Sequence, residues 1–130
     1  MAYADFITLS LHVAAASNTP GLGYVTLPSS LTGAYELVSV DRVSNVAITA
    51  DNTDYRTFTV YGADKSTAQA TRVTTVAGGS TVAGTPEELT LTGGSNAVFS
   101  PGGAIYVAAA EAGTGPACFE TFSFGLRKLR

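Results

Sequence analysis

The chain has 130 residues, of which 45% are hydrophobic and only 13% are charged, and its formal net charge is -3. This length fits one domain, which we place over residues 1–130. The acidic balance argues against a nucleic-acid partner, because nucleic-acid-binding proteins carry a basic patch. The longest apolar stretch, residues 104–110, is far shorter than the ~20 residues that span a bilayer, so we expect no membrane association.

A dense shell of charges cannot account for solubility, because a typical soluble domain has about 25% charged residues. Thr, Ser, Gly and Ala must cover much of the surface. We expect part of that surface to be buried against partner subunits, since the centres of protein interfaces are depleted in charge. The single cysteine, Cys118, excludes an internal disulfide. No basic region followed by an apolar run stands near the N-terminus, which predicts synthesis in a cytoplasm.

Alternation of apolar and polar residues with a period of two predicts strands along the chain. From Ile7 to Val13 every second residue is apolar, and this first strand ends at the turn residues 18–21. The run Asp-Asn-Thr-Asp at residues 51–54 is typical of a turn, because Asp and Asn side chains bond to nearby backbone. In this half we predict strands at residues 7–13, 24–27, 35–40 and 43–49, the last two separated by the polar Asp41-Arg42.

The clearest strand is residues 55–61, in which Arg56, Phe58 and Val60 face one side and aromatic and hydroxyl residues face the other. Residues 63–70 allow a short helix or a loop. The remaining strands are predicted at residues 71–76, 89–91, 104–109 and 119–126. Short strands separated by Gly and Pro turns predict an all-β fold, an antiparallel β-sandwich of jelly-roll type with about eight strands.

The lone histidine and the lone cysteine do not form a catalytic or metal-binding arrangement. His12 lies on the polar side of the first strand, where a surface or partner-facing imidazole is the favoured interpretation over a catalytic base. Cys118 has no CxxC spacing and is expected to be a small buried hydrophobic residue. The familiar zinc spacings are excluded as well. We therefore expect no enzyme activity, no cofactor and no small-molecule substrate.

Paired carboxylates are the remaining enzymatic possibility. Asp51 and Asp54 could offer oxygens to calcium, but their run lacks the spacing of a calcium-binding loop, so a turn is favoured. Glu87 and Glu88 follow Pro86 in an exposed-looking connection and are expected to be solvated surface charges. A glycan-cleaving site needs two carboxylates about 5 to 10 Å apart in a cleft. The sequence nominates no such pair.

Three of the seven basic residues stand within the last four positions: Arg127, Lys128 and Arg130. They form either a frayed, solvated terminus or an electrostatic anchor onto an acidic neighbouring subunit, where charges at the rim of an interface tune association and orientation. Both interpretations stay open at this point, and these residues are the candidate partner-binding site.

The tyrosines could line a carbohydrate platform. They are Tyr3, Tyr24, Tyr35, Tyr55, Tyr61 and Tyr106. The chain has no tryptophan, which weakens a sugar-binding interpretation. Packing in the core or in an interface is the preferred role for these side chains.

Residues 46–61, VAITADNTDYRTFTVY, resemble a segment of small virion proteins of tailed bacteriophages. In those proteins a strand ending in a TADNT-Y turn leads into a strand of the form TFTVY. Residues 85–92, TPEELTLT, match a later TP-ELTLT segment of the same family. The apolar residues 104–115 fit its penultimate strand before a glycine-rich turn. The first forty residues resemble these proteins only in their general pattern and not in a particular segment.

This resemblance implies a jelly-roll capsid decoration, or cement, protein. Such a protein forms homotrimers on the outside of an icosahedral phage head, at threefold or quasi-threefold positions, and clamps neighbouring subunits of the major capsid protein. It brings no catalytic residues with it. We therefore expect a structural virion protein on the capsid exterior. The alternative is a tail-fibre or receptor-binding tip domain that recognises a host surface glycan, because such a tip uses the same sandwich.

Overall fold

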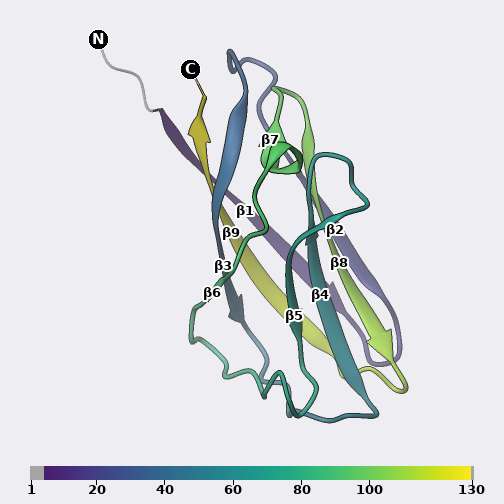
Figure 1. Cartoon of the computed structure of the whole chain (residues 1–130). Helices are drawn as coiled ribbons and strands as arrows, with labels where there is room; N and C mark the ends of the chain where they lie inside the picture. The colour runs from purple at the N-terminus through teal and green to yellow at the C-terminus, as the bar shows by residue number, and fades with distance from the viewer. Residues whose placement is uncertain (1–4, 130) are drawn as a thin grey trace.

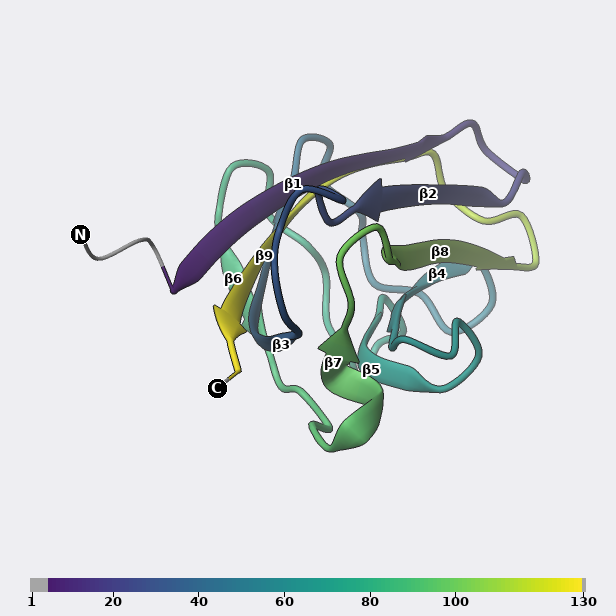
Figure 2. The same ribbon diagram turned by 90° about the horizontal axis from the view of Figure 1, so that it is seen from above.

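The computed structural model describes residues 5–129, which form nine β-strands and one turn of 3-10 helix. Two sheets face each other, as Figures 1 and 2 show from the side and from above. The elements are β1 (Phe6–Ala15), β2 (Gly21–Thr26), β3 (Tyr35–Ser44), β4 (Tyr55–Tyr61), β5 (Ala68–Val73), β6 (Glu87–Leu89), η1 (Ser95–Ala97), β7 (Val98–Phe99), β8 (Ala104–Ala112) and β9 (Cys118–Lys128). The predicted all-β sandwich is confirmed.

The two sheets have defined strand orders. The five-stranded sheet runs β1-β9-β3-β6, with β7 also paired to β3, and the four-stranded sheet runs β2-β8-β4-β5. Every ladder between these strands is antiparallel. The connections that cross between the sheets gather the loops at the two ends of the sandwich (Figure 1). Within residues 5–129 no helix is long and apolar enough to cross a membrane.

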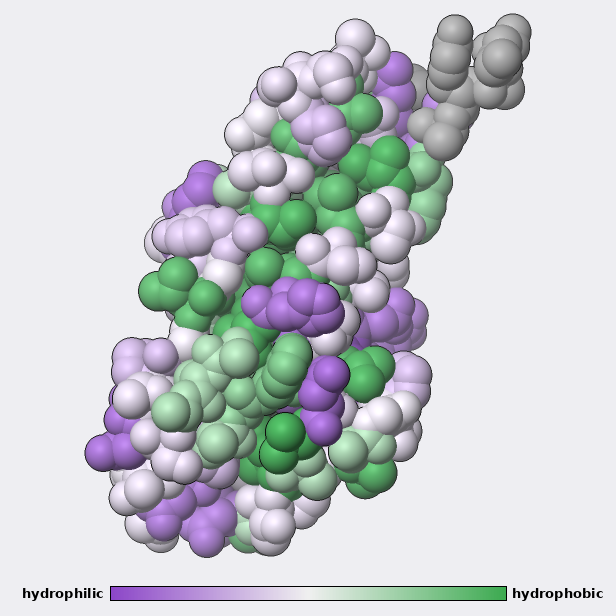
Figure 3. All heavy atoms as spheres, turned by 180° about the vertical axis from the view of Figure 1, so that it is seen from behind, coloured by the Kyte–Doolittle hydropathy of each residue, from purple (hydrophilic) through white to green (hydrophobic). Residues whose placement is uncertain are grey.

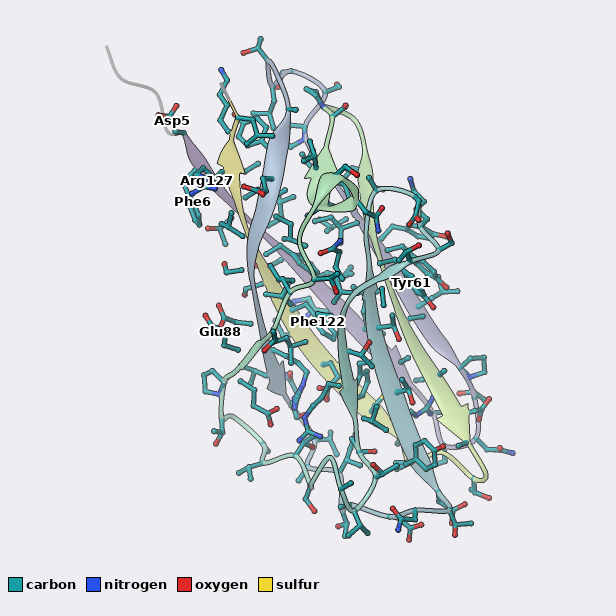
Figure 4. All side chains as sticks on the ribbon, viewed as in Figure 1. Asp5, Phe6, Tyr61, Glu88, Phe122 and Arg127 are labelled. Atoms are coloured by element: carbon teal, nitrogen blue, oxygen red, sulfur yellow. The ribbon has the colours of Figure 1, made fainter. Side chains whose placement is uncertain are left out.

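The core lies between the sheets and follows from the alternation in the sequence. On β9, Phe122, Phe124 and Leu126 point inward and are fully buried, as predicted. Phe58 of β4 faces them, with its ring centroid 6.3 Å from that of Phe122. Figure 4 shows Phe122 in the space between the sheets. Burying one such side chain contributes about 1.5–3 kcal/mol, so this layer is a main source of stability.

β3 is one ten-residue strand, so the predicted break at Asp41-Arg42 is wrong. Arg42 lies inside the strand with its side chain fully buried, and its Nη1 is 3.1 Å from Oε1 of Glu120 on β9. Ser44 donates a hydrogen bond of 2.7 Å to the other oxygen of that carboxylate. Because the charge is paired inside the protein, it does not end the strand. The strand predicted at residues 43–49 is wrong beyond Ser44, where a loop begins.

The sequence allowed a helix or a loop at residues 63–70. Residues 63–67 form a turn, and residues 68–70 are the beginning of β5. The carboxylate of Asp64 accepts hydrogen bonds from the N–H groups two and three residues ahead. Lys65 has a φ of 58°, in the left-handed region that does not continue a helix. β5 therefore lies earlier in the chain than the predicted strand at residues 71–76.

Candidate functional site

The outer face of the four-stranded sheet carries no charged side chain. Residues of β4 and β8 alternate between the core and this face, and the outward residues of β2 and β5 continue it. We call this surface the tyrosine face. Its members are Leu22, Tyr24, Thr26, Tyr55, Thr57, Thr59, Tyr61, Thr71, Val73, Ala104, Tyr106, Ala108 and Ala110. The outer face of the five-stranded sheet, by contrast, carries charged residues of both signs, Glu36, Asp41, Glu88 and Arg127.

Three tyrosines form a ladder across the tyrosine face. The ring centroids of Tyr24 and Tyr106 are 4.8 Å apart and those of Tyr106 and Tyr61 are 5.0 Å apart, with the rings nearly parallel. These spacings match the distance of about 4.7–4.9 Å between neighbouring strands, since the three residues occupy one row of the sheet. Tyr24 is 54% exposed at the edge strand. Figure 4 shows Tyr61 on the outside of the sandwich.

This stacking bears on the predicted carbohydrate platform. A sugar ring packs on the open face of an aromatic ring, but both faces of Tyr106 are covered by its neighbours. Tyr24 and Tyr61 stand at the two ends of the ladder, and each stacks on Tyr106 through one face of its ring. Tyr35 is buried in the core, and Tyr3 lies outside the described residues. Tyrosine offers rigid contact area with a polar tip, which suits contact with a protein surface.

A second apolar surface lies at the end of the sandwich opposite the two chain ends (Figure 1). We call it the apolar loop end, and it consists of residues 45–50 and 75–86, which contain no charged residue. Val46, Val76 and Val82 are exposed here, by 48%, 62% and 61%. Loops normally carry polar side chains toward water, and single exposed apolar residues are unremarkable. Three valines on two adjoining uncharged loops are typical of a contact surface.

Hydrogen bonds tie these two loops together. The N–H of Thr81 donates to the carbonyl of Ile48, and the N–H of Ile48 donates to the Thr81 hydroxyl, at 2.9 and 2.8 Å. The N–H of Ala50 donates to the Ser80 hydroxyl at 2.8 Å, and the N–H of Val76 donates to the Asn52 side chain at 2.9 Å. Ile48 is buried and fixes the first loop to the core. The exposed valines are thus held in fixed positions.

The predicted basic cluster lies at the end of β9, near both chain ends. Arg127 and Lys128 belong to the paired strand, so the interpretation as a frayed terminus does not hold for them. The Nη2 of Arg127 is 2.7 Å from Oε1 of Glu36, and Lys128 donates to the Thr32 hydroxyl at 3.3 Å. Figure 4 shows Arg127 beside Phe6. Arg130 lies outside the described residues.

A hollow of about 320 Å³ opens beside Lys128. It is lined by Asp5, Ile7, Ser30, Leu31, Thr32, Tyr35 and Lys128. The lining mixes an acidic, a basic and several hydroxyl side chains with two aliphatic ones, and it does not select one ligand chemistry.

His12 and Cys118 occupy ordinary structural positions. The Nδ1 of the exposed His12 ring lies 3.0 Å from the Thr121 hydroxyl, and the ring meets Phe119 edge-on at 6.0 Å. Cys118 is buried, as predicted, and this burial raises the pKa of its thiol. Neither side chain is paired with a second group that would make it a base or a nucleophile.

The acidic pairs have different roles. Asp51 accepts hydrogen bonds from the N–H groups of Thr53 and Asp54, which lower the pKa of Asp51 and confirm the predicted turn. Glu88 is exposed, as expected. The prediction that Glu87 is a solvated surface charge is wrong. Its carboxylate pairs with two arginines, at 2.8 Å from Arg72 and 3.4 Å from Arg42. Among residues 5–129 no three His, Cys, Asp or Glu side chains are grouped as a metal would need.

Arg56 is the structural residue that the sequence interpretation missed. Its side chain is fully buried, and it donates hydrogen bonds to the backbone carbonyls of four residues. The acceptors are Ala16, Thr19, Ala109 and Pro116. Arg56 thereby joins the β1–β2 loop to the β8–β9 loop. Its inward direction was visible in the alternation with Phe58 and Val60, but its acceptors were not.

A buried charge network links β3, β6 and β9. Burial raises the pKa of Glu120, against the lowering effect of the Ser44 hydroxyl and of Arg42. The hydrogen bond from Arg72 lowers the pKa of Glu87 at the partly exposed end of the network. The network therefore ties β3, β6 and β9 together inside the sandwich.

Comparison with known proteins gives no match to a family, to a curated protein sequence or to a solved structure. The resemblance of residues 46–61 and 85–92 to phage virion proteins thus stays a prediction.

Proposed function

We propose that this protein is a structural virion protein that decorates the exterior of an icosahedral phage head. It acts as a homotrimer, and each trimer braces neighbouring subunits of the major capsid protein. It performs no catalysis. The resemblance predicted from the sequence at residues 46–61 and 85–92 is the reason for considering this assignment.

The strand pairing supports a jelly roll as the form of the sandwich. When the two-residue β7 is set aside, eight strands remain. The first of these pairs with the last, the second with the seventh, the third with the sixth and the fourth with the fifth. Such nested pairing is what a long antiparallel ribbon gives when it wraps into two sheets, and an eight-stranded double sheet is the jelly-roll architecture.

The observation that carries the proposed function is the apolar loop end. Its valines are exposed, uncharged and held by hydrogen bonds, so they lose little conformational freedom when a partner covers them. Each fully buried valine contributes about 1.5–3 kcal/mol, which is weak for one copy. Three copies in one trimer act together, because the second and third contacts form at high effective concentration. Weak contacts thereby give stable bracing.

The test measures occupancy on phage heads that lack this protein, after incubation with purified protein. Val82→Asp places a charge on the apolar loop end. We expect its occupancy on the heads to be at least tenfold lower than that of the unmodified protein. Thr90→Asp is the matched control, because Thr90 is exposed outside both apolar surfaces, and its occupancy should equal that of the unmodified protein. Equal binding by the two variants would place the capsid contact elsewhere.

The same assay tests the anchor prediction for Arg127, Lys128 and Arg130. Removing these residues would also cut backbone pairs of β9 with β1 and β3, so substitution is the cleaner change. The double variant Arg127→Gln with Lys128→Gln keeps the strand and removes two charges. Arg127 lies at the end of the sandwich opposite the apolar loop end. Loss of binding by the double variant would therefore mean that the Arg127 end faces the capsid, and loss of binding by Val82→Asp would mean that the apolar loop end does.

A further inference from the structure

One long edge of the sandwich is left open by β1. β1 is the end strand of the five-stranded sheet, and among residues 5–129 its backbone pairs only with β9. The N–H of Lys128 donates to the carbonyl of Asp5, and bonded pairs alternate along an antiparallel ladder, so the odd-numbered residues of β1 bond to β9. The N–H and C=O groups of the even-numbered residues therefore point to the other side of the strand, which we call the open edge of β1. Its residues, all with exposed side chains, are Phe6, Thr8, Ser10, His12 and Ala14.

The other sheet edges carry protection that β1 lacks, because an open edge invites another strand and proteins blunt it by shortness, charge, proline, a bulge or a covering segment. β6 has three residues, of which two are Glu. β5 contains Arg72, and its outer side is covered where the N–H of Thr92 donates to the carbonyl of Gln69. β2 has six residues, two of them glycine, and begins directly after Pro20. β1, by contrast, has ten residues without Asp, Glu, Lys, Arg or Pro, and its register with β9 is unbroken.

We propose that the open edge of β1 binds an extended segment of a partner protein as an added strand. The hydrogen-bonding groups on the edge select this occupant. Backbone N–H and C=O groups recur there at every second residue, about 6–7 Å apart, and an extended polypeptide backbone presents the same repeat of donors and acceptors. The affinity of such a contact comes from main-chain hydrogen bonds, and the pattern of alternate side chains gives its specificity.

The side chains of β1 define the pattern expected of the added strand. On the inner side of β1, Ile7, Leu9 and Leu11 are only partly buried against the core. An added strand places every second side chain beside them, so those side chains should be apolar, whereas the side chains beside Thr8 and Ser10 should be polar. β1 and β2 lie on the side of the molecule that Figure 3 shows from behind, where hydrophobic side chains gather along the middle. The bound segment should therefore alternate apolar and polar residues.

A second copy of the chain is the competing occupant. The open edge that it offers is its own β1, and pairing β1 with itself in a closed assembly needs a twofold axis. The threefold assembly of the proposed function has no such axis. The choice of a different protein as the donor of the strand thus rests on the proposed function, whereas the open edge itself rests on the strand pairing.

The experiment follows amide hydrogen exchange by NMR in the full chain, with and without a synthetic peptide. The probe is a peptide of about ten residues that alternates Val and Thr, with Lys at each end for solubility. At saturating peptide we expect the amides of Thr8, Ser10 and His12 to exchange at least tenfold more slowly. The amides of Leu9 and Leu11, which bond to β9, should change less than twofold. The matched control peptide is N-methylated at each Thr. In an antiparallel added strand the outward-facing Thr residues are those that bond to β1, so this peptide lacks the donors and should not bind.

Ser10→Pro tests the open edge from the side of the protein. Proline at this position removes an N–H that points away from β9 and leaves the ladder with β9 in place. We expect this variant to bind the peptide at least tenfold more weakly. Ser10→Ala is the matched control, because it changes the side chain and keeps the N–H, and it should bind like the unmodified protein. Circular dichroism checks that both variants fold, and the N-methylated peptide decides the question if Ser10→Pro does not.

Three results would overturn the inference. The first is that the alternating peptide does not bind, and the second is that it binds no better than its N-methylated control. The third is slow exchange of the Thr8, Ser10 and His12 amides in the protein alone. If that protection is lost on dilution, a second copy is the occupant. These outcomes are separable from the proposed function: protein that binds the peptide and not phage heads would refute decoration alone, and protein that binds heads and not the peptide would refute the added strand alone.

Discussion

Arg56 shows how one residue can hold together loops that are far apart in the sequence. It is buried, and no carboxylate among residues 5–129 forms an ion pair with it. Its guanidinium donates instead to backbone carbonyls of two loops and of β8. Such an arrangement is stable because each buried donor has an acceptor, and it is vulnerable because removal of the side chain leaves several buried acceptors unpaired.

We predict that Arg56→Met lowers the free energy of unfolding by about 2–4 kcal/mol, since carbonyls of both loops lose their donor. Arg127→Met is the matched control. Arg127 is 61% exposed and pairs only with Glu36, so its loss should cost less than ~1 kcal/mol. Urea denaturation of both variants measures the difference, and similar losses would contradict the role assigned to Arg56.

Glu120 makes the stability of the folded protein depend on pH, and the sign of this dependence follows from the direction of its pKa shift. Burial raises the pKa of Glu120 in the folded state above its ordinary value of 4.5. The folded protein then binds a proton more tightly than the unfolded chain. The contribution of Glu120 to stability is fully present below that ordinary pKa and is lost as the pH rises through the folded pKa.

We therefore expect Glu120→Gln, which mimics the neutral acid, to gain stability relative to the unmodified protein as the pH rises from 4 to 7. Urea denaturation at several pH values gives this slope. A slope of the opposite sign would mean that the ion pair with Arg42, at 3.1 Å, outweighs burial. Glu87 has a lowered pKa and contributes the opposite trend. It is coupled to Glu120 through Arg42, so the measured slope belongs to the network of the two carboxylates.

At the scale of elements, the β4–β5 turn contains Lys65 at a φ of 58°. A residue with a Cβ is strained in this left-handed conformation, and glycine is not. Lys65→Gly should raise the free energy of unfolding by about 0.5–1 kcal/mol. Asn18 also has a positive φ, of 60°, but asparagine tolerates it, so Asn18→Gly is the control and should change stability little. Thermal denaturation of the Lys65→Gly and Asn18→Gly variants measures these two changes in stability.

The elements also show what the sequence could and could not predict. The strand at residues 55–61 and the inward face of β9 followed from alternation alone. The continuity of β3 did not, because the partner of Arg42 is Glu120, far away in the chain. The valines of the apolar loop end had been assigned to predicted strands at residues 43–49 and 71–76 or left in a turn. Alternation reports which side chains are apolar, and cannot tell a half-buried strand from a loop that exposes them.

The tyrosine ladder depends on the register in which the strands of the four-stranded sheet pair. Tyr24, Tyr61 and Tyr106 come from three strands that are distant in sequence, and only the pairing of β2 and β4 with β8 puts them in one row. The sequence supported a role in packing for tyrosines in general. It could not select these three, because a shift of one residue in register would turn a strand's side chains to the other face.

At the scale of the whole molecule, the sandwich has three differentiated surfaces. The four-stranded sheet presents an uncharged outer face with the tyrosine ladder. The apolar loop end is the surface that we propose to contact the capsid, and Asp5 and Arg127 lie at the opposite end. A trimer built this way places three apolar loop ends in the same direction, because a cyclic assembly has one polar axis. Under this proposal, the low share of charged residues, 13%, is explained by surfaces that partners bury.

The most direct test of this account is cryo-electron microscopy of virions from the source of the protein. The account predicts regular trimers over the head lattice, with the apolar loop ends against the major capsid protein. Density confined to the tail would contradict it and favour a receptor-binding tip that recognises a host glycan. Density absent from the particle would contradict a virion role altogether.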